Sequence, residues 1–398
     1  MIARGAWVAL ALLLAGCLPS VPPMLEPLRG KPTQASEEAG IWDQAERFER
    51  ELAKSKAVIR DEVLAAYLDG VTARVYAHLD PPRGITPRVV VVRQPLINAS
   101  ATPNGVVLLH TGILARIGNE AELATLLGHE LAHFVRRHSI RERQARRATE
   151  QSARLKNALS LGLLESPAGL EDEIARQVSG YSQQLELEAD RLGFEAMAAA
   201  GYDERASVRL FEVVLLDEES PDIEDPYYYA DHPSMAARAA HYRELIAHAR
   251  DAGGELGPER YEAAVLRVLP QNVRDDLALA RVRSARRGID RLLAAPKASS
   301  EAHFLLGEWH RLTGRGARAG EEADSAYARA VEVDANDAQA WRALGLVQRE
   351  RGRREQAIAS LERALTLDPG ALDRPILEAY VRELRKQAAA QSSKPSAP

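Results

Sequence analysis

Cysteine is nearly absent from this chain, since Cys17 is the only one among its 398 residues. A disulfide within the chain is therefore excluded. Long apolar runs are equally scarce. The segment Ala6–Ala15 is almost wholly apolar, but it falls well short of the roughly 20 residues that a membrane-spanning helix needs. The sequence thus favours a cleaved N-terminal segment over a permanent transmembrane span.

A block of positive charge is missing as well. The formal net charge is −5, and no dense run of Lys and Arg is paired with aromatic residues. Because a nucleic-acid-binding protein carries a basic footprint, we expect no nucleic-acid partner. What is present, 46% apolar and 27% charged residues, is the balance of a soluble globular protein. The length predicts two or three domains.

The N-terminus has the layout of a secretory signal, in which Arg4 precedes the apolar run and small residues follow it. The segment Leu14–Cys17 (LAGC) resembles the bacterial lipobox, whose cysteine is acylated. We therefore expect residues 1–17 to be a lipoprotein signal peptide and Cys17 to carry a lipid anchor in the cell envelope. The protein would be exported to the periplasm, and Leu18 favours the outer membrane over the inner one. The alternative is an ordinary cleaved signal with a chance cysteine.

Helical spacing dominates the rest of the chain. Residues 18–40 are rich in Pro, Gly and Ser and are predicted to be a linker. Apolar residues three and four apart predict amphipathic helices from Ile41 to about His78. The β-branched run Arg88–Val92, and Val106–His110 after an Asn-Gly turn, predict a small sheet or hairpin. Asn119, followed three residues later by a glutamate in the capping-box position, begins a strongly helical segment.

A repeating pattern replaces this one after about residue 250. The segment Ala338–Ala371 resembles a tetratricopeptide repeat, because residues of the required type fill seven hallmark positions. These are Trp341, Leu344, Gly345, Ala357, Leu361, Ala364 and Pro369. An upstream copy has Leu306, Gly307, Tyr327 and Ala330 in matching roles, and a degenerate third unit is predicted around Val273–Leu293. We expect repeats over 266–386 that bind protein partners, then a disordered tail over 387–398.

The motif that carries chemistry is GHELAH, inside the helix that Asn119 begins. Residues i and i+4 share one helix face, so His129 and His133 can both present a nitrogen to one metal ion. Glu130 beside them can act as general base toward a water at that ion. We predict one Zn²⁺ per chain. The alternative, two histidines that merely pack, would bury unpaired imidazoles at a considerable cost.

The third ligand is expected from a second acidic motif, ELEAD, which spans Glu186–Asp190. Glu186 would complete the zinc site. Asp190, one helical turn later, could accept the outer N–H of a ligand histidine and fix its tautomer. Glu188 points elsewhere by helical spacing. Alone, the segment would be interpreted as a solvated acidic face.

Together these motifs resemble the M48 family of zinc metallopeptidases, which includes the CAAX prenyl protease Ste24 and the heat-shock protease HtpX. The resemblance runs from about Val89 to Leu245. The family's third ligand is the first Glu of its ExxAD motif, which maps onto Glu186. Without membrane spans, the chain is similar to the soluble periplasmic BepA-like branch, where the peptidase domain is joined to tetratricopeptide repeats. Fold, zinc and endopeptidase activity are what the resemblance implies.

The resemblance also implies a role for a His-Pro loop at His232, which could fill the fourth zinc position and keep the enzyme latent until the loop moves. The alternative is an exposed loop histidine. Arg238 would position substrate or pair with an acid, while His110 and His138 are interpreted as structural. An exposed strand edge at Val106–His110 could pair with an extended substrate backbone.

The fold class expected is mainly α with a small β-sheet, with a zincin-type peptidase domain over 41–250 and a helical solenoid after it. The expected function is zinc-dependent endoproteolysis of misfolded or stalled envelope proteins, in outer-membrane protein quality control. One alternative is a chaperone or assembly factor that acts through its repeats with a latent zinc site. Another is a structural lipoprotein that binds no metal. Replacing Glu130 by Gln separates the first two.

Overall fold

The computed structural model describes residues 25–33, 36–145, 147, 182–218, 235–248, 253–314 and 316–392. The predicted lipidation site Cys17 and the predicted gate His232 lie outside these ranges. None of the helices in the described part is long and apolar enough to cross a lipid bilayer. The described fold is mainly helical with one small sheet, as the sequence predicts.

Three strands form the sheet: β1 (Arg88–Val92), β2 (Ala99–Ala101) and β3 (Val106–His110). Their order is β1-β3-β2, with β3 parallel to β1 and antiparallel to β2. The turn from β2 to β3 ends at Gly105, whose φ of 84° lies in the left-handed region that glycine adopts without strain. The predicted sheet is therefore confirmed, with a hairpin as one half of it.

The predicted strand edge is wrong. Val106–His110 is the central strand, so neighbours on both sides already bind its backbone. Among the described residues, the strand that contacts helix α5 and has a strand partner on one side only is β2. Three small residues give too short a pattern to be recognised as a strand, which is why β2 was missed.

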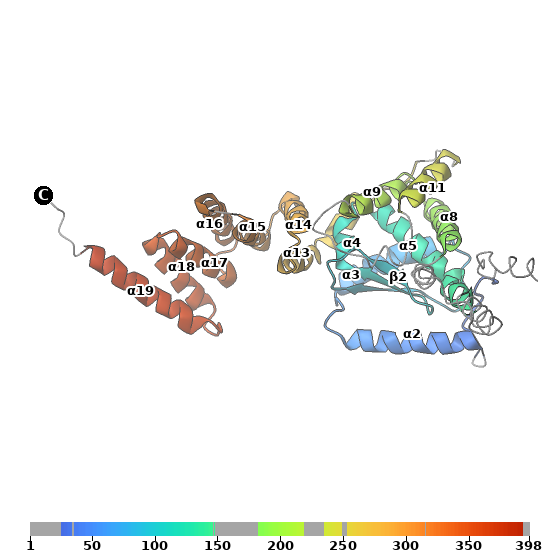
Figure 1. Ribbon diagram of the computed structural model, residues 1–398, viewed down its shortest axis with the longest axis horizontal. Helices are drawn as coiled ribbons and strands as arrows, with labels where there is room; N and C mark the ends of the chain where they lie inside the picture. Colours follow the sequence, from blue (N-terminus) through green and yellow to red (C-terminus); the bar gives the residue numbers. More distant parts are fainter. Residues whose placement is uncertain are drawn as a thin grey trace, which may run out of the picture.

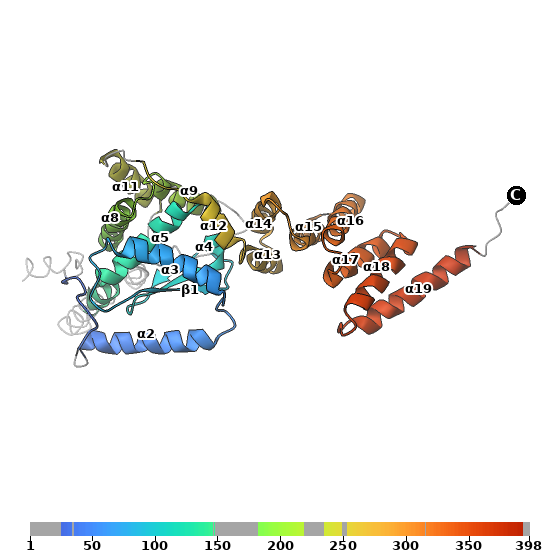
Figure 2. The ribbon, with the colours of Figure 1, turned by 180° about the vertical axis from the view of Figure 1, so that it is seen from behind.

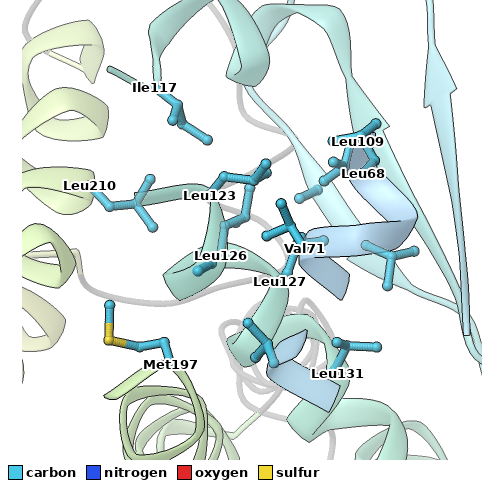
Figure 3. Close-up of a cluster of buried hydrophobic side chains, with 14 of the residues drawn as sticks. Leu68, Val71, Leu109, Ile117, Leu123, Leu126, Leu127, Leu131, Met197 and Leu210 are labelled. Carbon is cyan, nitrogen blue, oxygen red and sulfur yellow. The ribbon is translucent and has the colours of Figure 1, made fainter. Parts of the chain in front are cut away.

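Helix α5 (Glu120–Val135) is the centre of the N-terminal domain, and all of its residues are buried. Helix α3 (Glu62–Tyr76) and the sheet pack on one side of it, while α8 (Gln183–Ala199) and α9 (Ala206–Glu218) pack on the other (Figures 1 and 3). Figure 3 shows the leucines of α5 between these two layers. Other described helices of this domain are α2 (Glu37–Lys54), α4 (Thr111–Arg116) and α11 (Met235–His248).

The predicted capping box is present at the start of α5. The Asn119 side chain accepts a hydrogen bond from the Glu122 N–H at 2.9 Å. In return, the Glu122 carboxylate accepts from the Gly118 N–H at 2.7 Å and from the Asn119 side chain at 2.8 Å. Two otherwise unsatisfied amides are satisfied in this way, so the helix begins at a fixed residue.

Two helices extend into segments predicted to lack structure. Helix α2 begins at Glu37, inside the predicted linker 18–40, with Ser36 as its N-cap. Helix α19 (Arg374–Ser392) continues past the predicted start of the tail at 387.

Helices α5 and α8 cross at two glycines. A Cβ atom on Gly128 would lie 2.8 Å from the Gly193 carbonyl oxygen, and one on Gly193 would lie 2.6 Å from the His129 nitrogen. Such distances are shorter than carbon atoms allow, so both positions require glycine. The backbones therefore touch where α5 begins to carry its histidines.

The C-terminal part consists of successive helix pairs that extend away from the N-terminal domain (Figure 2). The pairs are α13 (Leu269–Ala278) with α14 (Val282–Ala294), α15 (Ser300–Thr313) with α16 (Gly316–Val333), and α17 (Ala338–Glu350) with α18 (Arg354–Leu367). They coincide with the three predicted units. Hallmark glycines lie at the close approaches, since a Cβ on Gly345 would be 2.7 Å from Leu361 and one on Gly307 would be 2.4 Å from Tyr327.

The two parts share a joint formed by α12 (Pro258–Val265) and α14. The Tyr261 hydroxyl donates to the Leu114 carbonyl at 2.7 Å. Arg291 donates to two further carbonyls, of Ala115 at 3.1 Å and Ile117 at 3.0 Å. Tyr261 itself belongs to the hydrophobic core of the N-terminal domain. The repeats are therefore fixed to the end of α4 and to the residue that follows it, just before α5.

Candidate metal centre

Three buried side chains from two helices converge on one point. His129 and His133 lie one turn apart on α5, and Glu186 lies in the first turn of α8. The two Nε2 atoms are 3.0 Å apart. Glu186 oxygens lie 3.6 Å from Nε2 of His129 and 3.4 Å from Nε2 of His133. None of the three side chains is more than 2% exposed.

These separations fit a tetrahedral zinc ion. Zinc bonds of about 2.0–2.2 Å to nitrogen and oxygen hold two ligand atoms of a tetrahedron about 3.3–3.6 Å apart. The three observed distances deviate from this range by no more than a few tenths of an ångström. Two neutral imidazoles and one carboxylate are also a donor set that zinc prefers. Among the described residues, this is the one His, Cys, Asp or Glu cluster with metal-ligand geometry.

Glu130 follows His129 directly on α5 and is 1% exposed. It is buried on the same helix as both histidines. Its role as general base stays a prediction from the motif.

The outer nitrogen of His129 contacts Asp190, as the sequence predicts. His129 Nδ1 lies 2.9 Å from Asp190 Oδ1, and the Tyr242 hydroxyl donates to the same oxygen at 3.1 Å. Burial by itself would raise the pKa of Asp190. The positive charge of Arg238 and the contact with His129 outweigh burial and hold that pKa well below its usual range. Asp190 is therefore a carboxylate that can fix the Nδ1–H tautomer of His129.

Arg238 of α11 closes this side of the site. Its side chain is 2% exposed and lies across Asp190, with Nε 3.0 Å from Oδ2. The other end of the guanidinium reaches Glu186, with Nη1 3.4 Å from Oε2. The ring of Phe211 packs on the guanidinium at 4.6 Å. The buried Arg238 guanidinium thus contacts both of the carboxylates, Glu186 and Asp190, that α8 places at the centre.

The outer nitrogen of His133 contacts a third histidine instead of a carboxylate. His133 Nδ1 lies 2.9 Å from Nδ1 of His138, which is fully buried. His138 Nε2 in turn lies 3.5 Å from Glu188 Oε2. Arg136 and Arg141 each donate to Glu188 at 2.7 Å.

The electrostatics of this second group favour a neutral ring beside a charged carboxylate. Burial lowers the pKa of His138, and the opposing contact with Glu188 does not reverse that direction. The contact with His138, together with the hydrogen bonds from Arg141 and Arg136, holds the pKa of Glu188 well below its usual range.

The structure brings together the residues that the sequence singled out in α5 and α8. The sequence left Arg238 open between positioning substrate and pairing with an acid, and the structure shows the pairing. The sequence did not predict the contact between His138 and Glu188. Helical spacing could not identify the partners of Arg238, because Asp190 and His129 lie about 50 and 110 positions away from it in the chain. Helical spacing predicts that Glu188 points away from the metal ligands, and Glu188 is indeed not among them. Spacing alone does not reveal that Glu188 contacts His138 instead.

Comparisons with known proteins agree with this geometry. The sequence profile of Peptidase family M48 matches residues 62–246, and that of the tetratricopeptide repeat matches residues 338–371. The second match coincides with the predicted repeat.

Three curated relatives illustrate the likeness. A "putative beta-barrel assembly-enhancing protease" of Vibrio cholerae is 34% identical over 50% of this chain and 42% of its own length. The "beta-barrel assembly-enhancing protease" of Escherichia coli K12 is 29% identical over 49% of this chain and 42% of its own length. The "mitochondrial metalloendopeptidase OMA1" of Arabidopsis thaliana is 32% identical over 34% of this chain and 27% of its own length. Each match thus covers less than half of the relative. Residues 62–246 of this chain are therefore similar to Peptidase family M48, and a tetratricopeptide repeat follows them at residues 338–371.

Proposed function

We propose that the protein is a zinc-dependent endopeptidase of the cell envelope. The observation that carries this proposal is the convergence of His129, His133 and Glu186 at tetrahedral ligand distances. Glu130 is buried on the same helix, directly after His129. A metal-free structural role would not require three ionisable groups in one buried place. The similarity of residues 62–246 to Peptidase family M48 supports the same chemistry.

In this proposal, His129, His133 and Glu186 hold the zinc ion. The ion, when bound, supplies Lewis acidity, which polarises a peptide carbonyl and lowers the pKa of a water to about 7. Glu130 takes the proton of the attacking water on a carboxylate oxygen and returns it to the leaving amine. Asp190 keeps His129 in the productive tautomer. The buried walls of α5 and α8 exclude bulk water from these transfers.

Strand β2 is the element that we propose for substrate alignment. An extended peptide can add to a strand that has a partner on one side only, as β2 has among the described residues, whereas β3 is already paired on both sides. Helix α5 contacts β2, so a peptide on its outer side would run past the helix that carries Glu130. Backbone pairing tolerates many side chains, which suits a protease that acts on unfolded clients.

We further propose that the clients are envelope proteins whose assembly has stalled or failed, and that the repeats recruit them. The support is the name of two relatives, which refers to enhanced β-barrel assembly, and the match of a protein-binding repeat. Export and a lipid on Cys17, with outer-membrane attachment, and gating by His232 remain part of the proposal on sequence grounds.

One experiment distinguishes the peptidase from the competing function, which is an assembly factor that works through the repeats. The purified protein without residues 1–17 is analysed for bound zinc, and cells that depend on it receive the wild type or Glu130→Gln. One zinc per chain, with loss of client degradation in the Glu130→Gln cells, supports the peptidase. Zinc-free protein, or degradation indifferent to Glu130, would assign the function to the repeats.

A further inference from the structure

The second ligand histidine has an unusual outer partner, and this difference points to a further functional residue. Outer nitrogens of zinc-bound histidines commonly donate to a carboxylate or a backbone carbonyl. His129 follows this rule through Asp190 at 2.9 Å. His133 meets the His138 ring instead, with the two rings edge-to-face at 82° and Nδ1 facing Nδ1 at 2.9 Å.

Two nitrogens at that distance share one proton, so one donates and the other accepts. If Nε2 of His133 offers its lone pair to the metal, the neutral ring carries its proton on Nδ1 and must donate. His138 then accepts at Nδ1. A neutral His138 with a free lone pair on Nδ1 carries its own proton on Nε2, the atom that faces Glu188 at 3.5 Å. The direction of every proton follows from the ligand role of His133.

Glu188 is suited to end this chain because it is held in place. Arg136 and Arg141, from the end of α5 and the residues after it, each donate to one of its oxygens at 2.7 Å. The carboxylate therefore remains charged and in a fixed position although 20% of its side chain is exposed. His138 has no exposed surface, so water cannot replace either neighbour.

We propose that His138 and Glu188 are positioning residues, which hold the ring of His133 in the orientation and tautomer that bind the metal. This inference rests on the proposed zinc site and adds to it a series of side-chain contacts, called the relay, that runs from His133 through His138 to Glu188. The two ligand histidines are then supported unequally. Asp190 contacts His129 directly, whereas the carboxylate that supports His133 acts through an intervening imidazole and polarises it less.

The test measures zinc affinity by competition with a chromophoric chelator, with the full chain lacking residues 1–17. His138→Leu keeps the apolar volume and removes the acceptor, and we expect its zinc dissociation constant to rise about 10- to 100-fold. His138→Asn, whose Oδ1 can accept near the position of Nδ1, should recover most of that loss. Glu188→Gln should give a smaller rise, and Glu195→Gln, an exposed residue on the same helix, should leave the affinity unchanged.

Thermal unfolding of the zinc-free proteins separates positioning from packing. A role in packing alone would lower the unfolding temperature of zinc-free His138→Leu and leave its zinc affinity intact, which would overturn the proposal. If His138→Leu does not fold, the Glu188→Gln variant tests the proposal instead. Equal zinc affinity of Glu188→Gln and Glu195→Gln would also overturn the proposal. Wild-type protein that binds no zinc would refute the proposed function itself. Wild-type zinc binding with an unaffected His138→Leu would refute only the relay.

Discussion

Gly193 touches Gly128 where α8 crosses α5, and the contact sets the distance between the two halves of the metal centre. A Cβ on Gly193 would lie 2.6 Å from the His129 nitrogen. Glu186 lies seven residues before Gly193, which is two helical turns and the same face of α8. The interhelix contact therefore fixes how closely Glu186 approaches the two histidines.

Gly193→Ala is expected to push the helices apart. Overpacking of this kind costs about 1–3 kcal/mol, and the shift should also weaken zinc binding because the donor atoms separate. Gly70→Ala in α3 is the matched control, since no atom lies within 4 Å of the Cβ it would add. That control should be neutral or slightly stabilising. Chemical denaturation and zinc titration check both variants, and equal behaviour of the two would contradict the role of the crossing.

Arg238→Gln is expected to destabilise the zinc-free protein by about 3–5 kcal/mol, because it leaves the buried Asp190 carboxylate without its cation. Adding Asp190→Asn should restore part of that loss, since the uncompensated charge disappears. Denaturant unfolding of the two single variants and the double variant forms a thermodynamic cycle. Strictly additive losses would show that the pair does not interact.

Arg291→Met is expected to loosen the joint between the repeats and α5. The change leaves the Ala115 and Ile117 carbonyls without their donor, which costs about 1–3 kcal/mol in a partly buried place. Arg318→Met, at a side chain that is 87% exposed, is the control and should change little. Unfolding followed by denaturant titration tests this, and two variants of equal stability would mean that the joint contributes nothing.

Glu255 gives a pH dependence at the same joint. Hydrogen bonds from Arg260 and Arg74 lower the pKa of Glu255 from 4.5 to about 2. Because the folded-state pKa is depressed, its contribution to stability is complete above about pH 4.5 and disappears as the pH falls toward 2. The difference in unfolding temperature between wild type and Glu255→Gln should therefore shrink over this range, and also with added salt. A difference that stays constant from pH 7 to 3 would contradict the assignment.

The sequence predicted those parts of the site that follow helical periodicity. His129 and His133 are one turn apart on one helix, and Glu186 and Asp190 repeat that spacing on another, so local geometry was enough. It did not predict contacts that only the tertiary fold creates. Arg238 reaches Asp190 from another helix. In the sheet, the Val-rich strands were visible, whereas β2 is strand-like only because β3 binds it.

The central claim is that Glu130 performs the proton transfers of a zinc peptidase. The most direct test is the rate of casein cleavage by wild type and Glu130→Gln at equal, measured zinc content. We predict one zinc per chain in both proteins and a loss of at least about 100-fold in the variant, the contribution of a general base. Cleavage by Glu130→Gln at the wild-type rate, with zinc bound in both, would contradict the account.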